Sequence, residues 1–598
     1  MHNVYLFQPQ YTTFINGKIN NWLPYSVGTI WSYAAQFSDI SNNFTLKDLI
    51  FKRENLDSLL DRLESPKVCG FSCYLWNRQY CLTIAEAIKH RWPECVIIFG
   101  GPEVSSRMTK YAFIDCILIG EGEENFVDIL RNILHNRAPD LFFPKKRLEE
   151  LTIPSPYLTG VFDTIIANNP EVVWAVTIET NRGCPYSCTF CDWGSLTYTK
   201  VKKFDLGKIS AEIAWLVNKP IAYIYIADAN FGMYKQRDIE IAKMLRQAVE
   251  NPTVELVSVQ AAKNNTEIAF QIGQILGPKY TGVTVSVQSM NDETLSLIKR
   301  KNMPTNNIAK LLDLAVKYNV PTYTEMILGM PHETKETWCK GMTDLLEIGQ
   351  HNSIEMWFTQ LLENSELSQP ESRKTYGIKS VTSKNYIGMS NSLDKDGIDE
   401  ITELICETNA MSTLDMIDSY MYGWMIVQLH IPGYSQIISK YLRYAKNITY
   451  RQFYDSLLPE ILSSKLIAPE YHRVKQMVEK FLTTGEVDKT VTGHFLYGAT
   501  NNWIYENKQQ VIDFIYQSSL KLSIIPEWVL NLQKQFIYDV NVTYPLQISA
   551  DYNILKKIPD PTVYEIDSKL SKEVDNYTLA TIRRKGVLKN AIKEYDIN

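Results

Sequence analysis

The amino-terminal part of the chain alternates short apolar runs with longer segments in which apolar residues recur every three or four positions. The short runs predict strands and the periodic segments predict amphipathic helices. Four runs read as strands: "NVYLFQP", "KVCGFSCY", "CVIIFGG" and "DCILIGEGE". The periodic segments are "VGTIWSYAAQF", "RQYCLTIAEAIKHRW" and "EENFVDILRNILHN". Strand then helix, repeated, is typical of a parallel sheet with helices on both faces, so we expect an α/β domain over residues 1–145.

Polar residues and glycines follow the expected strands, which is where ligands bind in sheets of this kind. They form four groups: Gln8 with Pro9, Ser72 to Asn77, Gly100 to Glu103, and Gly120 to Glu123. Because the carboxyl ends of parallel strands share one edge of the sheet, we expect these groups to border a single binding site.

A second alternation of strands and helices follows a connector. The connector, residues 146–170, contains "TIPSPYLTG", with two prolines and no clear period. Over residues 171–374 the predicted strands are "EVVWAVTIET", "IAYIYIADANFG", "VELVSVQAA", "GVTVSVQS", "PTYTEMILGMP" and "SIEMWFTQLLE". Predicted helices near 207–217, 235–249, 266–276, 291–299, 306–318 and 334–349 alternate with them. Six such units predict a partial (β/α)6 barrel, whose catalytic groups come from the carboxyl ends of its strands.

Beyond about residue 375 the strand alternation stops. Sequence such as "NNWIYENKQQVIDFIYQSSL" predicts helices, and no internal repeat is evident. We therefore expect a mainly α-helical C-terminal domain over residues 375–598 that covers the barrel mouth and selects the substrate.

Composition and charge narrow the class of protein. The chain is 45% hydrophobic and 21% charged with a net charge of -6, which is ordinary for a soluble globular protein and gives no charge signal for nucleic acid. The start, "MHNVYLFQPQYTT", lacks the features of a signal peptide and reads as a strand followed by a loop. The most apolar late stretch is interrupted by Asp418, His430 and Pro432, so we expect no membrane span and a cytoplasmic location.

The clearest chemical signal is a cluster of three cysteines directly after the first strand of the expected barrel. Cys184, Cys188 and Cys191 have the spacing C-x3-C-x2-C, whereas the other seven of the ten cysteines are scattered. Three thiolates cannot close a tetrahedral structural zinc site, which usually takes four ligands, and no histidine lies near in sequence. An iron–sulfur cluster with one iron open to an outside ligand fits better. The alternatives are a structural metal knuckle or incidental buried thiols.

The segment "GCPYSCTFCDWG" resembles the signature of the radical SAM enzymes. The resemblance implies a [4Fe-4S] cluster held by Cys184, Cys188 and Cys191, with S-adenosylmethionine (SAM) chelating the open iron through its amino and carboxylate groups. In the family, an electron from the cluster cleaves SAM to a 5′-deoxyadenosyl radical, which abstracts hydrogen. The cofactors carry this chemistry, and the protein supplies placement and exclusion of water.

Other strand ends are similar to the positions where this family contacts SAM. The resemblance implies polar contacts to the ammonium, ribose and carboxylate groups, and apolar packing on adenine. The residues concerned are Phe190, Asp228, Asn230, Gln260, Gln288, Ser289 and Leu328. Leu328 belongs to "ILGMPHET", in which His332 stands where the family more commonly has glycine. Each of these residues could alternatively be an ordinary cap at the end of a strand.

The first domain, placed ahead of such a barrel, resembles the Rossmann-like, flavodoxin-like cobalamin-binding domain of the B12-dependent radical SAM enzymes. Glycines at strand ends let the backbone approach a large flat ligand closely, and helix N-termini offer N–H groups. The residues that the resemblance implies as cobalamin contacts are Gln8, Pro9, Ser72, Tyr74, Trp76, Gly100, Gly101, Pro102, Glu103, Gly120, Glu121, Gly122 and Glu123. A purely structural or nucleotide-binding role for the domain is the alternative.

One departure from classical B12 proteins concerns the lower face of the corrin. The D-x-H-x-x-G loop that supplies an axial histidine is absent, and the loop after the first strand reads "QPQYTTFINGKIN". This absence matches the radical SAM branch, in which cobalt is held without a protein histidine. Trp76 is our candidate to lie under the corrin and exclude a lower ligand; the alternative is a core tryptophan.

Our leading hypothesis is a cobalamin- and SAM-dependent radical methyltransferase. A methyl group carried as methylcobalamin would reach an unactivated carbon of a small-molecule or peptide substrate after the 5′-deoxyadenosyl radical removes hydrogen. An external electron donor of the flavodoxin or ferredoxin kind would supply electrons. The first alternative is another radical SAM reaction, such as cyclisation, epimerisation or methylthiolation, with a degenerate cobalamin domain. The second is a non-catalytic iron–sulfur redox or binding protein.

Overall fold

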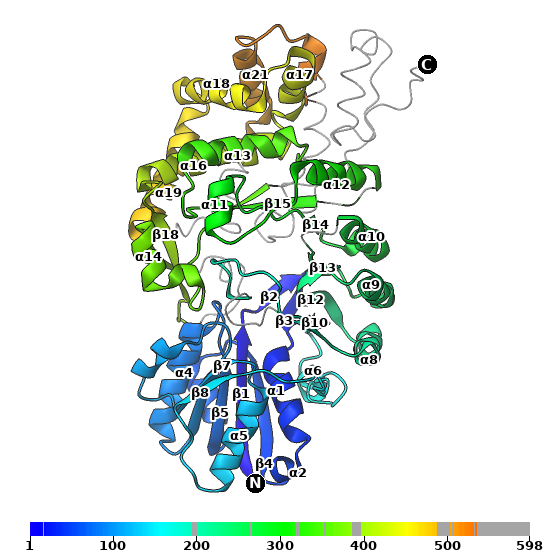
Figure 1. The fold of residues 1–598 in the computed structure, drawn as a ribbon, viewed down its shortest axis with the longest axis vertical. Coiled ribbons are helices and arrows are strands. Elements are labelled where there is room, and N and C mark those ends of the chain that lie inside the picture. Colours follow the sequence, from blue (N-terminus) through cyan, green and yellow to red (C-terminus); the bar gives the residue numbers. More distant parts are fainter. Residues whose placement is uncertain are drawn as a thin grey trace.

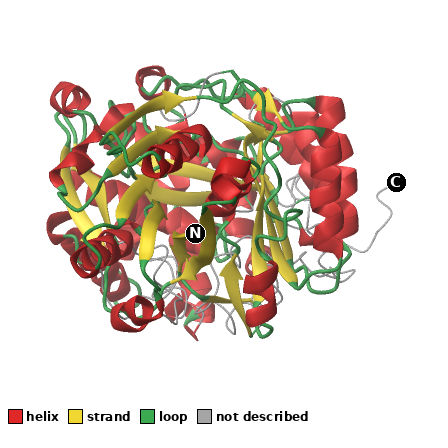
Figure 2. Cartoon of the chain, turned by 90° about the horizontal axis from the view of Figure 1, so that it is seen from below, coloured by secondary structure: helices red, strands yellow, loops and turns green. Residues whose placement is uncertain are grey.

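The computed structural model describes residues 1–534 apart from residues 16, 194–199, 263–265, 319, 321, 352–353, 385–395, 487–502, 505 and 532. The chain forms three tiers along its longest axis, beginning with the amino-terminal sheet and ending with a helical layer (Figure 1). Figure 2 shows the strands in the interior and the helices mainly around them.

The first tier is a six-stranded parallel sheet. Its strands are β1 (His2–Gln10), β4 (Phe44–Lys52), β5 (Pro66–Ser72), β6 (Val96–Gly100), β7 (Cys116–Gly120) and β8 (Phe142–Lys146), in the order β4-β1-β5-β6-β7-β8. The order reverses between β1 and β5, as in flavodoxin-like sheets, which confirms the predicted fold. β4 and β8 were not among the predicted strands. Both lie at sheet edges, where a strand needs fewer apolar residues.

Helices cover both faces of this sheet. On one face lie α1 (Tyr25–Ala35), α2 (Ser38–Ser41) and α5 (Glu123–Leu134); on the other lie α3 (Leu56–Arg62) and α4 (Arg78–Arg91), followed along the chain by a short 3-10 turn (Ser106–Lys110). Successive residues of β1 alternate between two apolar clusters: Leu6 packs with the α1 and α5 side, and Phe7 with the α3 and α4 side. This alternation follows from the two-residue period of a strand.

The loop expected after the first strand is instead a hairpin, which corrects the sequence-based prediction. Strands β2 (Thr13–Ile15) and β3 (Lys18–Trp22) pair with each other, and β3 also pairs in parallel with β9 (Val173–Ile178) of the second tier. Gly17, with φ of +76°, provides the left-handed backbone of the turn. The pairing partner of β3 lies about 150 residues away in sequence, so a local pattern does not reveal this strand.

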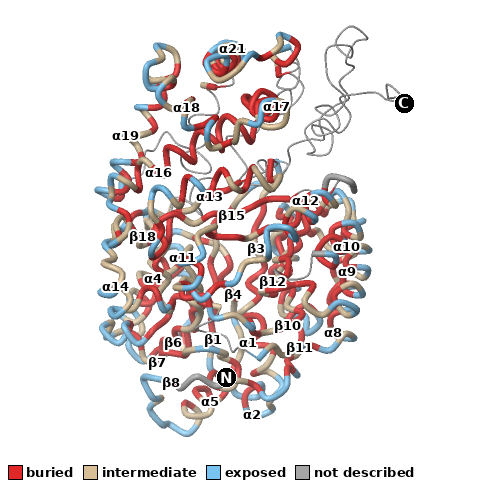
Figure 3. The backbone as a smooth tube through the Cα atoms, turned by 45° about the horizontal axis from the view of Figure 1, so that its top comes forward, coloured by how far each residue is buried: buried red, intermediate tan, exposed pale blue. Residues whose placement is uncertain are grey.

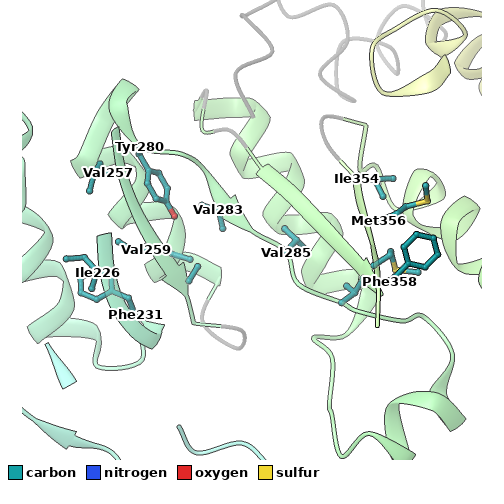
Figure 4. Close-up of a cluster of buried hydrophobic side chains, with 14 of the residues drawn as sticks. Ile226, Phe231, Val257, Val259, Tyr280, Val283, Val285, Ile354, Met356 and Phe358 are labelled. Atoms are coloured by element: carbon teal, nitrogen blue, oxygen red, sulfur yellow. The ribbon is translucent and has the colours of Figure 1, made fainter. Parts of the chain in front are cut away.

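The second tier is a partial barrel made of two arcs. One arc contains β9, β12 (Ile221–Phe231) and β13 (Leu256–Ala261), extended by β3 and β2; the other contains β14 (Val283–Thr284), β15 (Thr322–Leu328) and β16 (Ile354–Phe358). The helices are α8 (Leu206–Val217), α9 (Lys235–Val249), α10 (Thr266–Leu276), α11 (Asp292–Leu297), α12 (Thr305–Tyr318) and α13 (Lys335–Glu347). Apolar side chains from both arcs form one cluster (Figure 4). The predicted partial barrel is confirmed.

Several short elements complete the described fold. α6 (Asp163–Asn168) lies in the connector, and β10 (Asn181–Arg182) pairs with β11 (Lys202–Lys203). Short 3-10 turns occur at Gly277–Lys279 and Glu366–Ser368, and a π-helical turn at Ile426–His430 continues the helix that ends at Met425.

The third tier is mainly helical, as predicted, but it begins with a β-hairpin that the sequence analysis missed. After α14 (Pro370–Tyr376), strands β17 (Lys379–Lys384) and β18 (Ile401–Glu407) pair antiparallel. The hairpin adds two strands that the sequence analysis did not name to the mainly helical domain expected beyond about residue 375. The 16 residues between the two strands hid the hairpin, because short connections are the signal by which a hairpin is recognised in sequence.

The helices that follow pack on the barrel through α13. They are α16 (Thr413–Met425), α17 (Gln436–Lys446), α18 (Tyr450–Ser463), α19 (Ala468–Thr484) and α21 (Lys508–Ser519). Trp338 of α13 is fully buried, and its Nε1 donates to the Ser419 carbonyl of α16 at 2.9 Å. Figure 3 shows buried residues along the strands and on the inner sides of these helices. None of the helices in the described ranges combines the length and apolar character needed to cross a membrane.

Candidate functional site

A cavity of about 820 Å³ lies where the carboxyl ends of the first sheet face the barrel. The structure brings almost all of the predicted cobalamin contacts to its wall. These are Gln8, Ser72, Tyr74, Trp76, Gly100, Gly101, Pro102, Glu103, Gly120, Glu121, Gly122 and Glu123. Pro9 does not line the cavity; its carbonyl accepts a hydrogen bond from Asn77 Nδ2 at 3.0 Å. Contact of these residues with cobalamin stays a prediction.

Glycine backbone forms much of the wall on the sheet side. Gly101 has φ of +103°, and a Cβ on it would lie 2.6 Å from the Cys73 carbonyl oxygen, so no other residue fits there without a shift. Gly120 is also left-handed, with φ of +86°. A wall without side chains suits a broad flat ligand that lies against the strand ends.

Two stacked aromatic rings form another part of the wall. The rings of Tyr74 and Trp76 lie 4.5 Å apart at an angle of 10°, and the Tyr74 hydroxyl bonds the Ser26 hydroxyl at 2.6 Å. Trp76 Nε1 is buried and has no hydrogen-bond partner, which leaves a donor for a ligand that fills the cavity. No histidine is among the described residues of the cavity wall.

Asn77, which the sequence analysis mentioned only as part of a segment, fixes this loop. It is fully buried; its Nδ2 donates to the carbonyls of Pro9 and Ser72, and its Oδ1 accepts from the Tyr74 amide at 2.8 Å. The loop that carries Tyr74 and Trp76 is therefore tied to the ends of β1 and β5, on both sides of the point where the strand order reverses.

The opposite wall belongs to the barrel and to the cysteine loop. Cys191 lines the same cavity as the strand ends of the first sheet. Tyr223 and Tyr225 of β12 also line it and pack edge-on against Trp22 of the β2–β3 hairpin. The cysteine loop and the strand ends predicted to contact cobalamin thus border the same cavity.

Of the three cysteines of the signature, Cys191 lines the cavity, whereas Cys184 and Cys188 do not. Cys184 and Cys188 are buried and Cys191 is half-buried, and all three are free thiols. Burial raises the pKa of Tyr186, and the nearby Cys184 and Cys188 raise it further. Asn230 Nδ2 lies 3.4 Å from Cys184 Sγ. The donor set of three thiols suits an iron–sulfur cluster with an open iron.

In the described ranges, however, no group of three or more Cys, His, Asp or Glu side chains is already arranged to hold a metal ion.

Arg300 is a cation beside the thiols that sequence reasoning missed. It is buried, its Nε donates to Asn302 Oδ1 at 3.0 Å, and it also hydrogen-bonds Cys188. Burial lowers the pKa of Arg300, while Cys188, Glu325 and Cys191 raise it. Arg300 lies in "KRKNMPT" after α11, a segment without a recognisable motif, so no signal in the sequence marks it.

Asp228 anchors the start of the cysteine loop. Its carboxylate is fully buried and accepts the backbone N–H groups of Thr180 and Asn181 at 2.8 and 3.1 Å, as well as both of their side chains. Burial raises the pKa of Asp228 to about 7. Its carboxylate is thus already engaged in holding the loop, and its predicted contact with SAM stays a prediction.

Asn230, two residues farther along β12, is the better-placed polar group. Its Oδ1 is buried without a hydrogen-bond partner, next to Cys184. An unpartnered buried acceptor is costly, and it fits an ammonium donor such as that of SAM.

None of the predicted SAM contacts, Asp228 and Asn230 included, lines the cavity; the remaining ones lie on the barrel and in the cysteine loop. Gln260 is the next-to-last residue of β13 and hydrogen-bonds Tyr225. Gln288 is buried with φ of +64°, and its Nε2 donates to Glu325. Ser289 donates to Glu333, Leu328 is fully buried at the end of β15, and Phe190 is half-buried in the cysteine loop. Their roles stay predictions.

His332, noted as an unusual residue in its motif, has φ of +65°. The left-handed backbone explains why glycine would be commoner at this position.

An ion-pair network crosses the cavity between the two sheets, and the sequence did not indicate it. Arg182, two residues before Cys184, donates to Glu123 of α5 at 2.7 Å and to Glu179 at 2.9 Å. Glu179 also accepts from the Tyr25 hydroxyl of α1. The network joins the amino terminus of the cysteine loop to the first sheet.

Two family models match separate parts of the chain. Residues 178–344 match the model of the "Radical SAM superfamily", and residues 31–130 match that of the "B12 binding domain".

Two curated relatives cover most of the chain. The cobalamin-dependent radical SAM methyltransferase TokK from Streptomyces tokunonensis is 33% identical over 73% of this chain and 67% of its own length. The 2-(S-pantetheinyl)-carbapenam-3-carboxylate methyltransferase from Streptantibioticus cattleyicolor is 32% identical over 74% of this chain and 68% of its own length.

A similar fold occurs in a solved structure of the radical S-adenosylmethionine methyltransferase TsrM from Kitasatospora setae with cobalamin and a [4Fe-4S] cluster bound. It has a TM-score of 0.51 at 14% identity and covers 81% of this chain and 99% of that one. At this identity the likeness supports the fold alone.

Proposed function

The chain belongs to the family of cobalamin-dependent radical SAM methyltransferases, and from this membership we propose that it methylates a carbon of a carbapenam carboxylate. The family establishes the leading hypothesis from the sequence: an enzyme that uses a [4Fe-4S] cluster, SAM and cobalamin. It also decides against a non-catalytic iron–sulfur protein. The substrate class, the roles of individual residues and the electron donor are proposals.

One observation carries the mechanistic part of the proposal. Cys191 of the cysteine loop and the strand ends of the first sheet line one cavity of about 820 Å³. When bound, the cluster and SAM supply hydrogen abstraction from the substrate, and cobalamin supplies the methyl group. Both kinds of chemistry must act on one carbon, so the two sites must open onto a shared space, and this cavity supports that requirement.

The residues of this chain hold and shield the cofactors in the proposal. Cys184, Cys188 and Cys191 would bind the cluster, and Asn230 Oδ1 would accept a hydrogen bond from the SAM ammonium. Asp228 holds the loop through the Thr180 and Asn181 amides. The glycines at the strand ends and the stacked Tyr74 and Trp76 would hold the corrin. The apolar wall of Trp22, Tyr223 and Tyr225 excludes water from the reacting carbon.

The substrate proposal comes from the relative whose name specifies a 2-(S-pantetheinyl)-carbapenam-3-carboxylate. About a third of the aligned residues are identical over most of both chains, and this degree of similarity supports a substrate of the same chemical class. We propose a bicyclic β-lactam that bears a carboxylate and a thioether side chain, with an external flavodoxin- or ferredoxin-like donor as the source of electrons.

The test is an oxygen-free incubation of the reconstituted enzyme with cobalamin, SAM, a reductant and the pantetheinyl carbapenam. Mass spectrometry should find a product heavier by one CH2 group, together with 5′-deoxyadenosine and S-adenosylhomocysteine. SAM labelled in its methyl group should pass the label to the product. The Cys188→Ala protein is the matched control and should form none of the three.

Two outcomes would contradict the proposal. Release of 5′-deoxyadenosine without methylation of any carbapenam would reject the substrate class but leave the family chemistry intact. Absence of corrin absorption in the reconstituted protein would reject the assignment of the cavity.

A further inference from the structure

A fully buried arginine lies against the loop that carries Tyr74 and Trp76, hereafter the aromatic loop. Arg53 follows directly after β4, and its side chain has 0% exposure. All five of its N–H donors are used. Nε and Nη2 donate to the two carboxylate oxygens of Asp396 at 2.7 and 2.9 Å, and Nη2 also donates to the Ile398 carbonyl at 2.6 Å. Nη1 donates to Glu400 at 2.7 Å and to the Trp76 carbonyl at 3.2 Å.

Aromatic rings complete the surroundings of this cation. The guanidinium carbon of Arg53 lies 4.5 Å from the ring centroid of Tyr11 and 4.6 Å from that of Tyr80. Tyr11 follows β1, and Tyr80 lies in the first turn of α4. Arg53 therefore contacts three elements at the carboxyl edge of the first sheet together with residues 396–400, which lie more than 300 positions later in the chain.

Glu400 makes a second connection to the same loop. Its carboxylate accepts the backbone N–H groups of Gln79 and Tyr80 at 2.7 and 3.0 Å, which otherwise have no partner in the first turn of α4. α4 begins at Arg78, immediately after the loop that carries Tyr74, Trp76 and Asn77. A side chain of the third tier thus caps the helix that ends the aromatic loop.

Stability alone does not account for this arrangement. A buried ion pair costs desolvation that its attraction barely repays, and apolar residues of similar volume often stabilise a protein as well or better. An arginine paired with two carboxylates instead fixes geometry, because the N–H donors of its planar guanidinium point in set directions. Here they fix the position of the Trp76 backbone relative to residues 396–400.

We propose that Arg53 is a positioning residue of the cobalamin site, which uses the docked 396–400 segment of the third tier to set the Tyr74–Trp76 stack against one face of the corrin. The inference rests on the proposed function of the cavity. If Arg53 acts in this way, the shape of the corrin site depends on residues 396–400 of the third tier. The Tyr74–Trp76 stack would then be placed correctly for cobalamin only when that segment is packed against the first sheet.

The test compares the cobalt coordination of the full-length protein loaded with cob(II)alamin in wild type, Trp76→Ala, Arg53→Met and Glu400→Gln. Electron paramagnetic resonance distinguishes four-coordinate cobalt from cobalt with a water on its lower face. We expect the wild type to be four-coordinate and Trp76→Ala to bind water. Arg53→Met should resemble Trp76→Ala although its tryptophan is intact, with cobalamin bound roughly tenfold more weakly. Glu400→Gln should show a mixture.

Arg373→Met is the matched control, because Arg373 also forms a bidentate pair, with Glu403 of the β17–β18 hairpin, but does not touch the loop. It should keep the wild-type signal. If Arg53→Met does not fold, the milder Glu400→Gln carries the test alone.

Wild-type coordination and affinity in folded Arg53→Met and Glu400→Gln would overturn the inference, and so would the same change in Arg373→Met. A wild type that binds cobalamin with a water beneath the cobalt would also overturn it. A wild type that binds no cobalamin would instead overturn the proposed function.

Discussion

Asn230 is the residue for which the structure most directly supports a predicted hydrogen bond to SAM. Its Oδ1 is a buried acceptor without a partner, 46 positions from the thiol that its Nδ2 touches. The near-isosteric Asn230→Leu removes this unmet acceptor, so the apoprotein should be at least as stable as the wild type. SAM should bind roughly tenfold more weakly, the expected loss for a hydrogen bond to a charged group. Anaerobic calorimetry measures the affinity, and thermal melting measures the stability.

Asn251 provides the control for that experiment. Its Nδ2 donates to the Val217 and Lys219 carbonyls, and its Oδ1 accepts from the Thr253 amide. Asn251→Leu should therefore melt at a lower temperature and bind SAM normally. The opposite pattern, a destabilised Asn230→Leu with unchanged SAM affinity, would assign Asn230 to the structure of the barrel.

Glu103 should make stability depend on pH. Burial raises its pKa to about 7, against the opposing effect of Arg78. The unfolded chain loses this proton near pH 4.5, whereas the folded protein keeps it up to about pH 7. Because the folded state binds more protons in this window, the free energy of unfolding must fall as the pH rises through it. The stabilising contribution is complete only below about pH 4.5.

The Glu103→Gln protein lacks this effect. Between pH 5 and pH 8, the stability of the wild type should decrease relative to the variant by at most about 3 kcal/mol. Urea unfolding of the apoproteins at the two pH values measures the difference. Asp192, whose pKa is also raised to about 7, is present in both proteins, so the comparison concerns mainly Glu103. A difference that does not change with pH would mean that Glu103 is ionised throughout.

Sequence reasoning located the residues of the cavity because their position depends on local pattern alone. Gly101 and Gly120 follow short apolar runs, and parallel strands bring their carboxyl ends to one edge. The same reasoning could not find Arg53, Arg182 or Arg300. The carboxylate partners of Arg53 lie more than 300 positions away, and those of Arg182 include Glu123 in another tier. Nothing within a short window distinguishes such arginines from solvated ones.

At the scale of elements, the strands that escaped prediction either lie at sheet edges or pair with distant segments. β4 and β8 are sheet edges, and β3 and β17 pair with segments that are distant or reached through a long connection. An edge strand does not need an apolar run, and a hairpin is recognised mainly by its turn. The central strands and the helices of the barrel, whose apolar periodicity reflects burial directly, were predicted close to their observed bounds. The domain boundaries stay predictions. By sequence, the β2–β3 hairpin belongs to the first predicted domain, but β3 pairs with β9 of the barrel.

The packing of α13 against α16 predicts how much stability the buried Trp338 contributes. Trp338 is fully buried between them and donates to the Ser419 carbonyl. Trp338→Ala should destabilise the part of the molecule that contains these helices by about 3–5 kcal/mol, because the substitution leaves a cavity and an unsatisfied carbonyl. Trp92→Ala, at a half-buried position after α4, should cost less than about 1 kcal/mol. Equal losses in the two variants would show that α13 and α16 do not depend on this contact.

At the scale of the whole molecule, the cofactor cavity is also the joint between the first two tiers. Phe51 of β4 packs edge-on against Trp174 of β9, the β2–β3 hairpin extends the barrel sheet, and Arg182 binds carboxylates on both sides of the cavity. Cobalamin at this joint would contact both tiers at once. Its binding should therefore stabilise both tiers together and not the first alone, by about 4 kcal/mol at a thousandfold excess over its dissociation constant.

Replacing Arg182 should uncouple the two tiers. Arg182→Gln leaves Glu123 and Glu179 facing each other, mostly buried, without a countercharge, a change that typically costs about 3–5 kcal/mol. The lost stability lies in the contact between the first two tiers. Calorimetry of the apoprotein should therefore resolve two unfolding transitions for these tiers, where the wild type shows one. Arg373→Gln, which breaks an ion pair within the third tier, should lower stability without separating them. If Arg182→Gln still unfolds the two tiers in one transition, the apolar contacts of Phe51 and Trp174 suffice to join them, and the ion pairs serve only to shape the cavity.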